Sequence, residues 1–100
     1  MNNLKMIQQT IVPILKRNGV EFAAIFGSRA RAEEKKESDI DILIRFASPK
    51  SLLHNIALEQ ELSGALGIKV DLVSEKYLHP YIRSNVAKDL AVVYGQRQYI

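Results

Sequence analysis

The chain has 100 residues, of which 47% are hydrophobic and 25% are charged, a balance typical of a folded globular protein and not of a disordered one. Cysteine is absent, which excludes disulfides and thiolate metal sites and makes the cytoplasm the expected location. No apolar run nears the roughly 20 residues of a membrane-spanning helix, and the first residues lack the apolar core of a signal peptide. The net charge of +3 favours acidic partners such as nucleotides, RNA or an acidic protein surface. We expect one domain over residues 1–100.

The N-terminal segment has apolar residues at helical spacing. They are Leu4, Ile7, Ile11, Ile14 and Leu15. This pattern predicts a helix that stops near Asn18 and Gly19. Pro13 lies inside it and lacks the backbone N–H that a helix needs, so we expect a kink or a restart there.

An apolar segment over residues 20–26 predicts a strand that leads directly into Gly27 and Ser28. A glycine-serine turn at a strand end has backbone N–H groups and a hydroxyl free to bind a phosphate. Taken alone, such turns are common, and a purely structural role is the alternative.

Two aspartates, Asp39 and Asp41, begin a second predicted strand over residues 40–46. Residues two apart on a strand point to the same face, so both carboxylates project together. The other face carries the apolar residues Ile40, Ile42 and Ile44. Neighbouring carboxylates repel each other, so without a metal at least one should have a raised pKa, and Mg²⁺ is a suitable counter-ion. The alternative is a half-buried edge strand with solvent-facing aspartates.

Residues 52–66 have the leucine-rich spacing of a second helix that ends near Gly64 or Gly67, and a third strand over residues 69–74 follows at once. This strand carries Asp71 between two apolar residues. If it lies beside the strand over residues 40–46, Asp71 joins the other two aspartates on one face. Three such carboxylates can hold two divalent ions about 3.5–4 Å apart, the arrangement used in nucleotidyl transfer.

A third helix over residues 78–90, with Pro80 in its first turn, and a last strand over residues 90–94 complete the prediction. The order of elements indicates an α/β (α+β) fold. In it, a small mixed sheet packs with helices and the site lies at one exposed end or face.

The spacing of these motifs resembles that of a known superfamily. An apolar residue with Gly27-Ser28, ten further residues and then Asp-apolar-Asp-apolar is similar to the DNA polymerase β nucleotidyltransferase pattern. More narrowly, residues 26–31, 38–42 and 70–73 resemble the minimal nucleotidyltransferases (MNT). The resemblance implies a polymerase β-type fold, with the metal-binding catalytic carboxylates at Asp39, Asp41 and Asp71. It places the nucleotide-binding residues at Gly27, Ser28, Arg29 and Arg31.

In the MNT family the small protein is usually the antitoxin of a pair whose toxin is a HEPN-domain ribonuclease. The resemblance therefore implies an enzyme that uses Mg²⁺, as two ions, to transfer AMP from ATP to a tyrosine of a HEPN toxin partner. We expect no membrane partner, and we do not expect direct nucleic-acid binding, although the sequence leaves it open. ATP rests on the resemblance alone, because no residue of the sequence sets base selectivity.

Two alternatives stay open. The chain has little beyond a nucleotide-and-metal site to enclose a second substrate, so a protein partner is the simplest acceptor. Such a protein could instead neutralise its toxin by binding alone, with transfer dispensable, or it could transfer a nucleotide to RNA or a small molecule. The complete set of three aspartates favours the enzyme, because a binder has no physical need for clustered like charges. Arg29 and Arg31 are equally compatible with phosphate or acceptor binding and with solvated loop charges.

Overall fold

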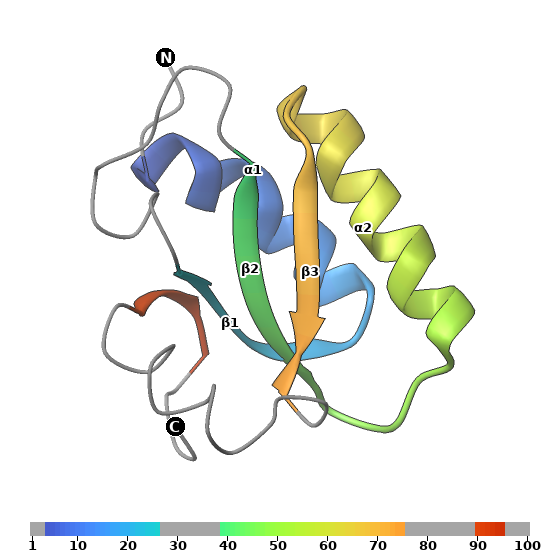
Figure 1. The fold of residues 1–100 in the computed structure, drawn as a ribbon. Coiled ribbons are helices and arrows are strands. Elements are labelled where there is room, and N and C mark those ends of the chain that lie inside the picture. The colour runs from blue at the N-terminus through green and yellow to red at the C-terminus, as the bar shows by residue number, and fades with distance from the viewer. Residues whose placement is uncertain (1–3, 27–38, 76–89, 96–100) are drawn as a thin grey trace.

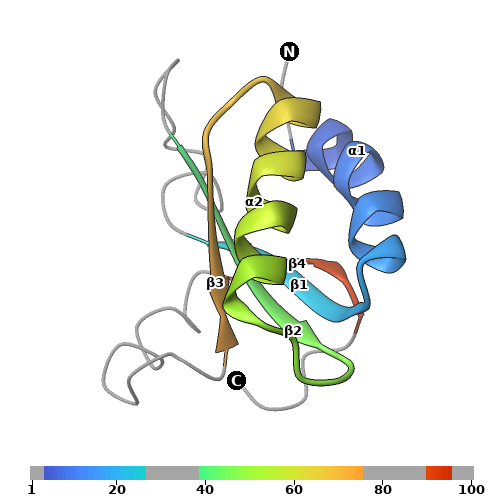
Figure 2. The same cartoon turned by 90° about the vertical axis from the view of Figure 1, so that its right-hand side faces the viewer.

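The computed structural model describes residues 4–26, 39–75 and 90–95. The elements in chain order are α1 (Leu4–Arg17), β1 (Val20–Phe26), β2 (Ile40–Phe46), α2 (Leu52–Leu66), β3 (Val70–Ser74) and β4 (Ala91–Tyr94). The strands form one mixed sheet in the order β3-β2-β1-β4 (Figure 1). Both helices lie on the same side of this sheet (Figure 2). The predicted α+β fold is confirmed, while residues 78–89 of the helix expected over residues 78–90 lie outside the described ranges.

The sheet combines two kinds of pairing. β1 and β2 are antiparallel, and β4 is antiparallel to the other side of β1. β2 and β3 are parallel, and α2 supplies the crossover that a parallel pair requires. Because β2 lies between β1 and β3, the alternative that its aspartates belong to an edge strand is wrong.

The alternation of β2 places its isoleucines in the core. Ile40, Ile42 and Ile44 are fully buried on the side of the sheet that the helices cover, as predicted. The helices contribute their own buried residues to this core: Ile7, Ile11, Leu15, Leu58 and Leu62. On the other face, Phe22, Ala24 and Leu43 form a second and smaller buried cluster. Each large apolar side chain buried in this way stabilises the fold by about 1.5–3 kcal/mol.

Helix α1 runs without interruption through Pro13, so the predicted restart is wrong. A proline inside a helix costs about 3 kcal/mol because one backbone hydrogen bond is lost. Ile11 and Leu15 lie on either side of Pro13 and are both fully buried against the sheet. Their packing offsets the local penalty and keeps the helix continuous.

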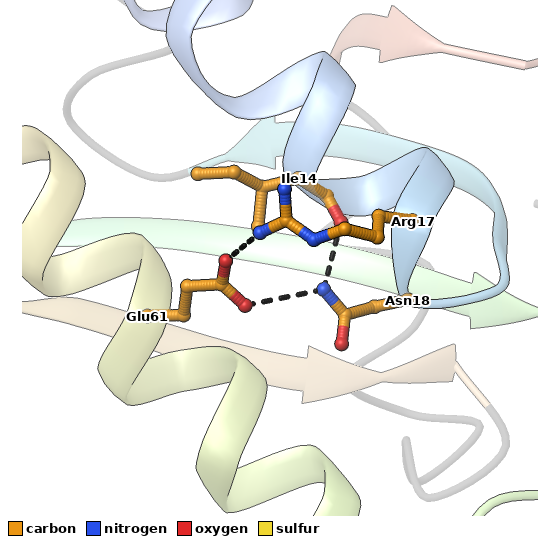
Figure 3. A network of polar contacts seen from close by, with 4 residues as sticks. All are labelled: Ile14, Arg17, Asn18 and Glu61. Carbon is orange, nitrogen blue, oxygen red and sulfur yellow. Dashed lines mark hydrogen bonds and ion pairs between the residues drawn. The ribbon is translucent and has the colours of Figure 1, made fainter.

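A polar network joins the end of α1 to the middle of α2 (Figure 3). The carboxylate of Glu61 on α2 accepts hydrogen bonds from the Arg17 guanidinium and from Asn18 Nδ2, the latter at 3.2 Å. The same Nδ2 donates to the Ile14 carbonyl at 2.8 Å. Glu61 therefore fixes the position of one helix end relative to the other helix.

Gly95, directly after β4, is a position that only glycine can occupy without displacement of the backbone. Its φ of +79° is strained for other residues, and a Cβ atom there would lie 2.1 Å from the Glu21 carbonyl oxygen of β1.

We expect Gly95→Ala to lower the free energy of unfolding by about 2 kcal/mol or more, measured by urea denaturation. Gly64→Ala is the matched control, because Gly64 lies in α2 with no atom within 4 Å of its Cβ position. The control should gain about 0.5–1 kcal/mol. A Gly95→Ala protein as stable as the wild type would contradict the close approach of β4 to β1.

Candidate active site

Asp41 and Asp71 occupy directly paired positions on the parallel strands β2 and β3. Paired residues of neighbouring strands project to the same face of a sheet, so the two carboxylates lie side by side. The residues that flank them along both strands are buried on the helix side: Ile40, Ile42, Val70 and Leu72. The carboxylates consequently leave the sheet on the face away from the helices, and both aspartates are half-buried.

This arrangement changes the acidity of Asp41. Burial raises the pKa of the Asp41 carboxyl above its ordinary value of 3.8, and the negative charges of Asp71 and Asp39 raise it further. A hydrogen bond between the Asp41 and Asp71 carboxyls acts on the pKa in the same direction. A raised pKa in this cluster is what the sequence predicts for the metal-free protein. A bound proton or a nearby cation therefore stabilises the Asp41 carboxyl, because either one offsets its negative charge.

Asp39 lies immediately before β2, and its side chain is more exposed, with a relative accessibility of 44%. The backbone N–H of Ile40 donates to the Lys69 carbonyl at 3.0 Å, which continues the β2–β3 register back to Asp39 and Lys69. The Lys69 ammonium lies 3.9 Å from Asp39 Oδ2. This exposed ion pair is weak, worth up to about 1 kcal/mol. Sequence reasoning did not single out Lys69, although it stands two residues before Asp71 just as Asp39 stands two before Asp41.

The donor set fits a magnesium ion. Mg²⁺ is usually held by one or two carboxylates, and water and substrate phosphate oxygens complete its coordination. Asp41 and Asp71 are the pair that would hold it. Within the described residues, no three His, Cys, Asp or Glu side chains are grouped closely enough to bind a metal together. Asp39 lies beside Lys69 instead, so its participation requires that it leave this ion pair.

The predicted nucleotide-binding residues Gly27, Ser28, Arg29 and Arg31 lie outside the described residues. The strand that leads to them is described, and it ends at Phe26. Phe26 is the register partner of Asp41. Gly27 therefore follows in the sequence directly after Phe26, the residue that is paired with Asp41.

The opposite end of β2 carries a second charged group that sequence reasoning missed. Arg45 bonds to Glu21 and, at 3.3 Å, to the nearly buried Glu75, and its guanidinium lies 5.1 Å from the centre of the Phe22 ring. A cavity of about 400 Å³ lies beside Arg45 and Glu75, lined by the β2–α2 connection and the end of β3. Arg45 and Glu75 are 30 residues apart, so no local motif indicates this pair.

Comparison with known proteins defines the family. A family model described as "Polymerase beta, Nucleotidyltransferase" matches residues 9–99, so the chain belongs to this nucleotidyltransferase family. It is 45% identical over 95 residues to "Putative protein adenylyltransferase MJ1217" of Methanocaldococcus jannaschii, covering 93% of this chain and 97% of that protein. It is also 41% identical over 78 residues to "Protein adenylyltransferase MntA" of Thermococcus cleftensis, covering 78% of this chain and 79% of that protein. The chain is thus an enzyme of the nucleotidyltransferase class.

Solved structures agree with this assignment. A crystal structure of a toxin–antitoxin with AMP-PNP matches with a TM-score of 0.81 and 26% identity, over 91% of this chain and 75% of the other. A structure described as "putative minimal nucleotidyltransferase" matches with a TM-score of 0.78 and 34% identity, over 88% of this chain and 90% of the other. The resemblance to the minimal nucleotidyltransferases is confirmed. In the described parts of the chain, no helix is both long and apolar enough to cross a membrane.

The raised pKa of Asp41 predicts a specific dependence of stability on pH. Between the pKa of the unfolded chain and the higher pKa of the native state, the native protein binds more protons, so its free energy of unfolding falls as the pH rises through that interval. Asp41→Asn removes this loss. Without divalent ions, we expect the variant to be more stable than the wild type at neutral pH, and this advantage should vanish below about pH 3.8.

Urea denaturation in the presence of a chelator, repeated from acid to neutral pH, measures this difference. An advantage of Asp41→Asn that is equally large at both ends of the pH range would show that ionisation of Asp41 is not its cause.

Proposed function

We propose that this chain is the antitoxin of a toxin–antitoxin pair and a Mg²⁺-dependent protein adenylyltransferase. It transfers AMP from ATP to a tyrosine of its HEPN ribonuclease toxin and neutralises the toxin by doing so. The observation that carries this proposal is the register pairing of Asp41 with Asp71, which puts two carboxylates side by side on the sheet face opposite α1 and α2. Support comes from relatives that are named protein adenylyltransferases and from a structural neighbour that is a toxin–antitoxin with AMP-PNP.

In this reaction the tyrosine oxygen bonds to the α-phosphorus of ATP and its hydroxyl proton passes to the solvent. The bond from that phosphorus to the bridging oxygen breaks, and pyrophosphate leaves. Asp41 on β2 and Asp71 on β3 would hold Mg²⁺, and Asp39, the exposed residue before β2, would join them. When bound, the ions supply charge neutralisation at the triphosphate and activation of the tyrosine hydroxyl. Gly27 and Ser28 bind the phosphates, and Arg29 and Arg31 assist, as the resemblance implies. ATP as donor and the absence of cysteine fit a cytoplasmic site of action.

The toxin is proposed as the acceptor because the carboxylates lie on a sheet face that the two helices do not cover. A small chain of this kind positions the nucleotide, while the acceptor protein brings its own surface. The net charge of +3 is compatible with an acidic face on that partner.

The double variant Asp39→Asn with Asp41→Asn separates transfer from binding. It keeps the side-chain shapes and removes two negative charges, so it should still associate with the toxin. Transfer should fall on the order of a thousandfold, because the groups that stabilise charge in the transition state are lost. Labelling of the toxin from radioactive ATP measures transfer, calorimetry measures association, and RNA cleavage measures neutralisation.

Glu61→Gln is the control for this experiment, since Glu61 lies on α2 and binds Arg17 and Asn18 away from the carboxylates. It should label the toxin as the wild type does. If the double variant neutralises the toxin fully, masking by binding is the mechanism and the proposed transfer is dispensable. Labelling of RNA or a small molecule in place of the toxin would replace the proposed acceptor.

A further inference from the structure

The outer edge of β3 carries two backbone amides that no strand of the described sheet pairs. β3 is the last strand on its side of that sheet. The Lys69 carbonyl accepts from Ile40, so the odd-numbered residues of this segment turn their backbone groups towards β2. The N–H groups of Val70 and Leu72 therefore point away from β2. Such edge groups need other partners or they invite pairing with a foreign strand.

Two side chains of α2 supply these partners. Ser63 Oγ accepts from the Val70 N–H at 2.9 Å, and Glu59 Oε2 accepts from the Leu72 N–H at 2.8 Å. Four residues of an α-helix rise about 6.0 Å, and two residues of a strand rise about 6.6 Å, so the spacings match. The earlier residue of the helix meets the later residue of the strand, which suits an antiparallel approach of α2 to β3. Because the spacings match, both hydrogen bonds can form at once between α2 and the edge of β3.

Asp71 lies between Val70 and Leu72, the two residues whose amides bond to α2. When both carboxyls are ionised, the like charges of Asp71 and Asp41 repel each other, and this repulsion favours a movement of β3 that separates them. The ladder to β2 opposes this movement from one side of the strand, and the bonds to α2 oppose it from the other. We infer that Glu59 and Ser63 are positioning residues that hold Asp71 level with Asp41 for metal binding. This inference rests on the proposed function, because it gives α2 a role in the same site.

A purely structural role for the two bonds predicts a different effect on metal affinity. If Glu59 and Ser63 only stabilise the fold or block the strand edge, their removal lowers stability but leaves the metal affinity of the folded protein unchanged. Metal affinity therefore separates the two roles, and it can be measured with no nucleotide, toxin or catalysis. Mn²⁺ is a suitable probe, because carboxylate and water ligands suit it as they suit Mg²⁺.

The experiment compares variants that remove an acceptor with variants that keep one. Glu59→Met removes the carboxylate, whereas Glu59→Gln keeps an oxygen at the same distance along the side chain. Glu61→Met is the matched control on the same helix, because Glu61 bonds to Arg17 and Asn18 and not to β3. Calorimetry with Mn²⁺ alone gives the metal affinity. Amide hydrogen exchange at Leu72 reports whether the hydrogen bond from the Leu72 N–H to Glu59 is present.

We expect Glu59→Met to bind Mn²⁺ about tenfold more weakly and to exchange the Leu72 amide faster. Glu59→Gln and Glu61→Met should both stay close to the wild-type affinity. If Glu59→Met exchanges faster at Leu72 but binds Mn²⁺ as the wild type does, the inference is wrong while the proposed function stands. If the wild type itself takes up no Mn²⁺, the proposed metal site and the inference both fail.

Ser63 provides the same test if Glu59→Met does not fold. Ser63→Ala removes the acceptor for the Val70 amide, and Ser63→Thr keeps it. Weaker Mn²⁺ binding in Ser63→Ala, with recovery in Ser63→Thr, supports the positioning role. Equal affinity in both variants overturns it.

Discussion

The parallel pairing of β2 with β3 is the constraint on which the site depends. It forces Asp41 and Asp71 into directly opposite positions, although their charges repel each other. Each strand buries the residues on either side of its aspartate, and each of those side chains contributes about 1.5–3 kcal/mol. The repulsion between two partly solvated carboxylates is a few kcal/mol at most, which is less than the summed contribution of these buried side chains. The apolar face of the two strands therefore holds the polar face in an arrangement that the aspartates alone would not adopt.

The mixed topology gives this arrangement its direction. Parallel β2 and β3 begin at the same end of the sheet, and the antiparallel β1 finishes there, with Phe26 paired to Asp41 (Figure 1). The two described helices, α1 and α2, lie on one face of the sheet (Figure 2). Asp41 and Asp71 project from the other face and are half-buried there. Lys69 and the α2 side chains that bond to β3 adjoin the same pair of strands. Asp71 is thus paired with Asp41 of β2, and the amides of its two neighbours in β3 bond to α2.

Much of the fold follows from local pattern, because the periods of helices and strands are visible in the sequence. The burial of Ile40, Ile42 and Ile44 and the end of α1 near Asn18 were predictable in this way. Of the kink or restart predicted at Pro13, the restart was wrong because a local penalty was weighed without the packing of Ile11 and Leu15. The alternation of each strand predicts which face an aspartate occupies, but it does not specify which strands become neighbours. The pairing of Asp41 with Asp71 therefore depended on an assumption that only the structure could check.

The contacts of Lys69 and Glu59 were missed for the same reason. Glu59 and Leu72 are 13 residues apart on different elements, and no periodicity connects them. The roles of Gly27, Ser28, Arg29 and Arg31 have a different basis, since they rest on the resemblance to minimal nucleotidyltransferases. These roles stay predictions.

Addition of Mn²⁺ to the isotopically labelled protein, followed by nuclear magnetic resonance, tests most directly whether the paired carboxylates bind a divalent ion. A bound paramagnetic ion broadens the signals of nearby amides, so we expect the amide signals of Asp41 and Asp71 to broaden first. This broadening should be lost in Asp41→Asn with Asp71→Asn. Sharp signals at Asp41 and Asp71, with broadening elsewhere, such as at Glu75 beside the cavity, would show that the paired carboxylates are not the metal site.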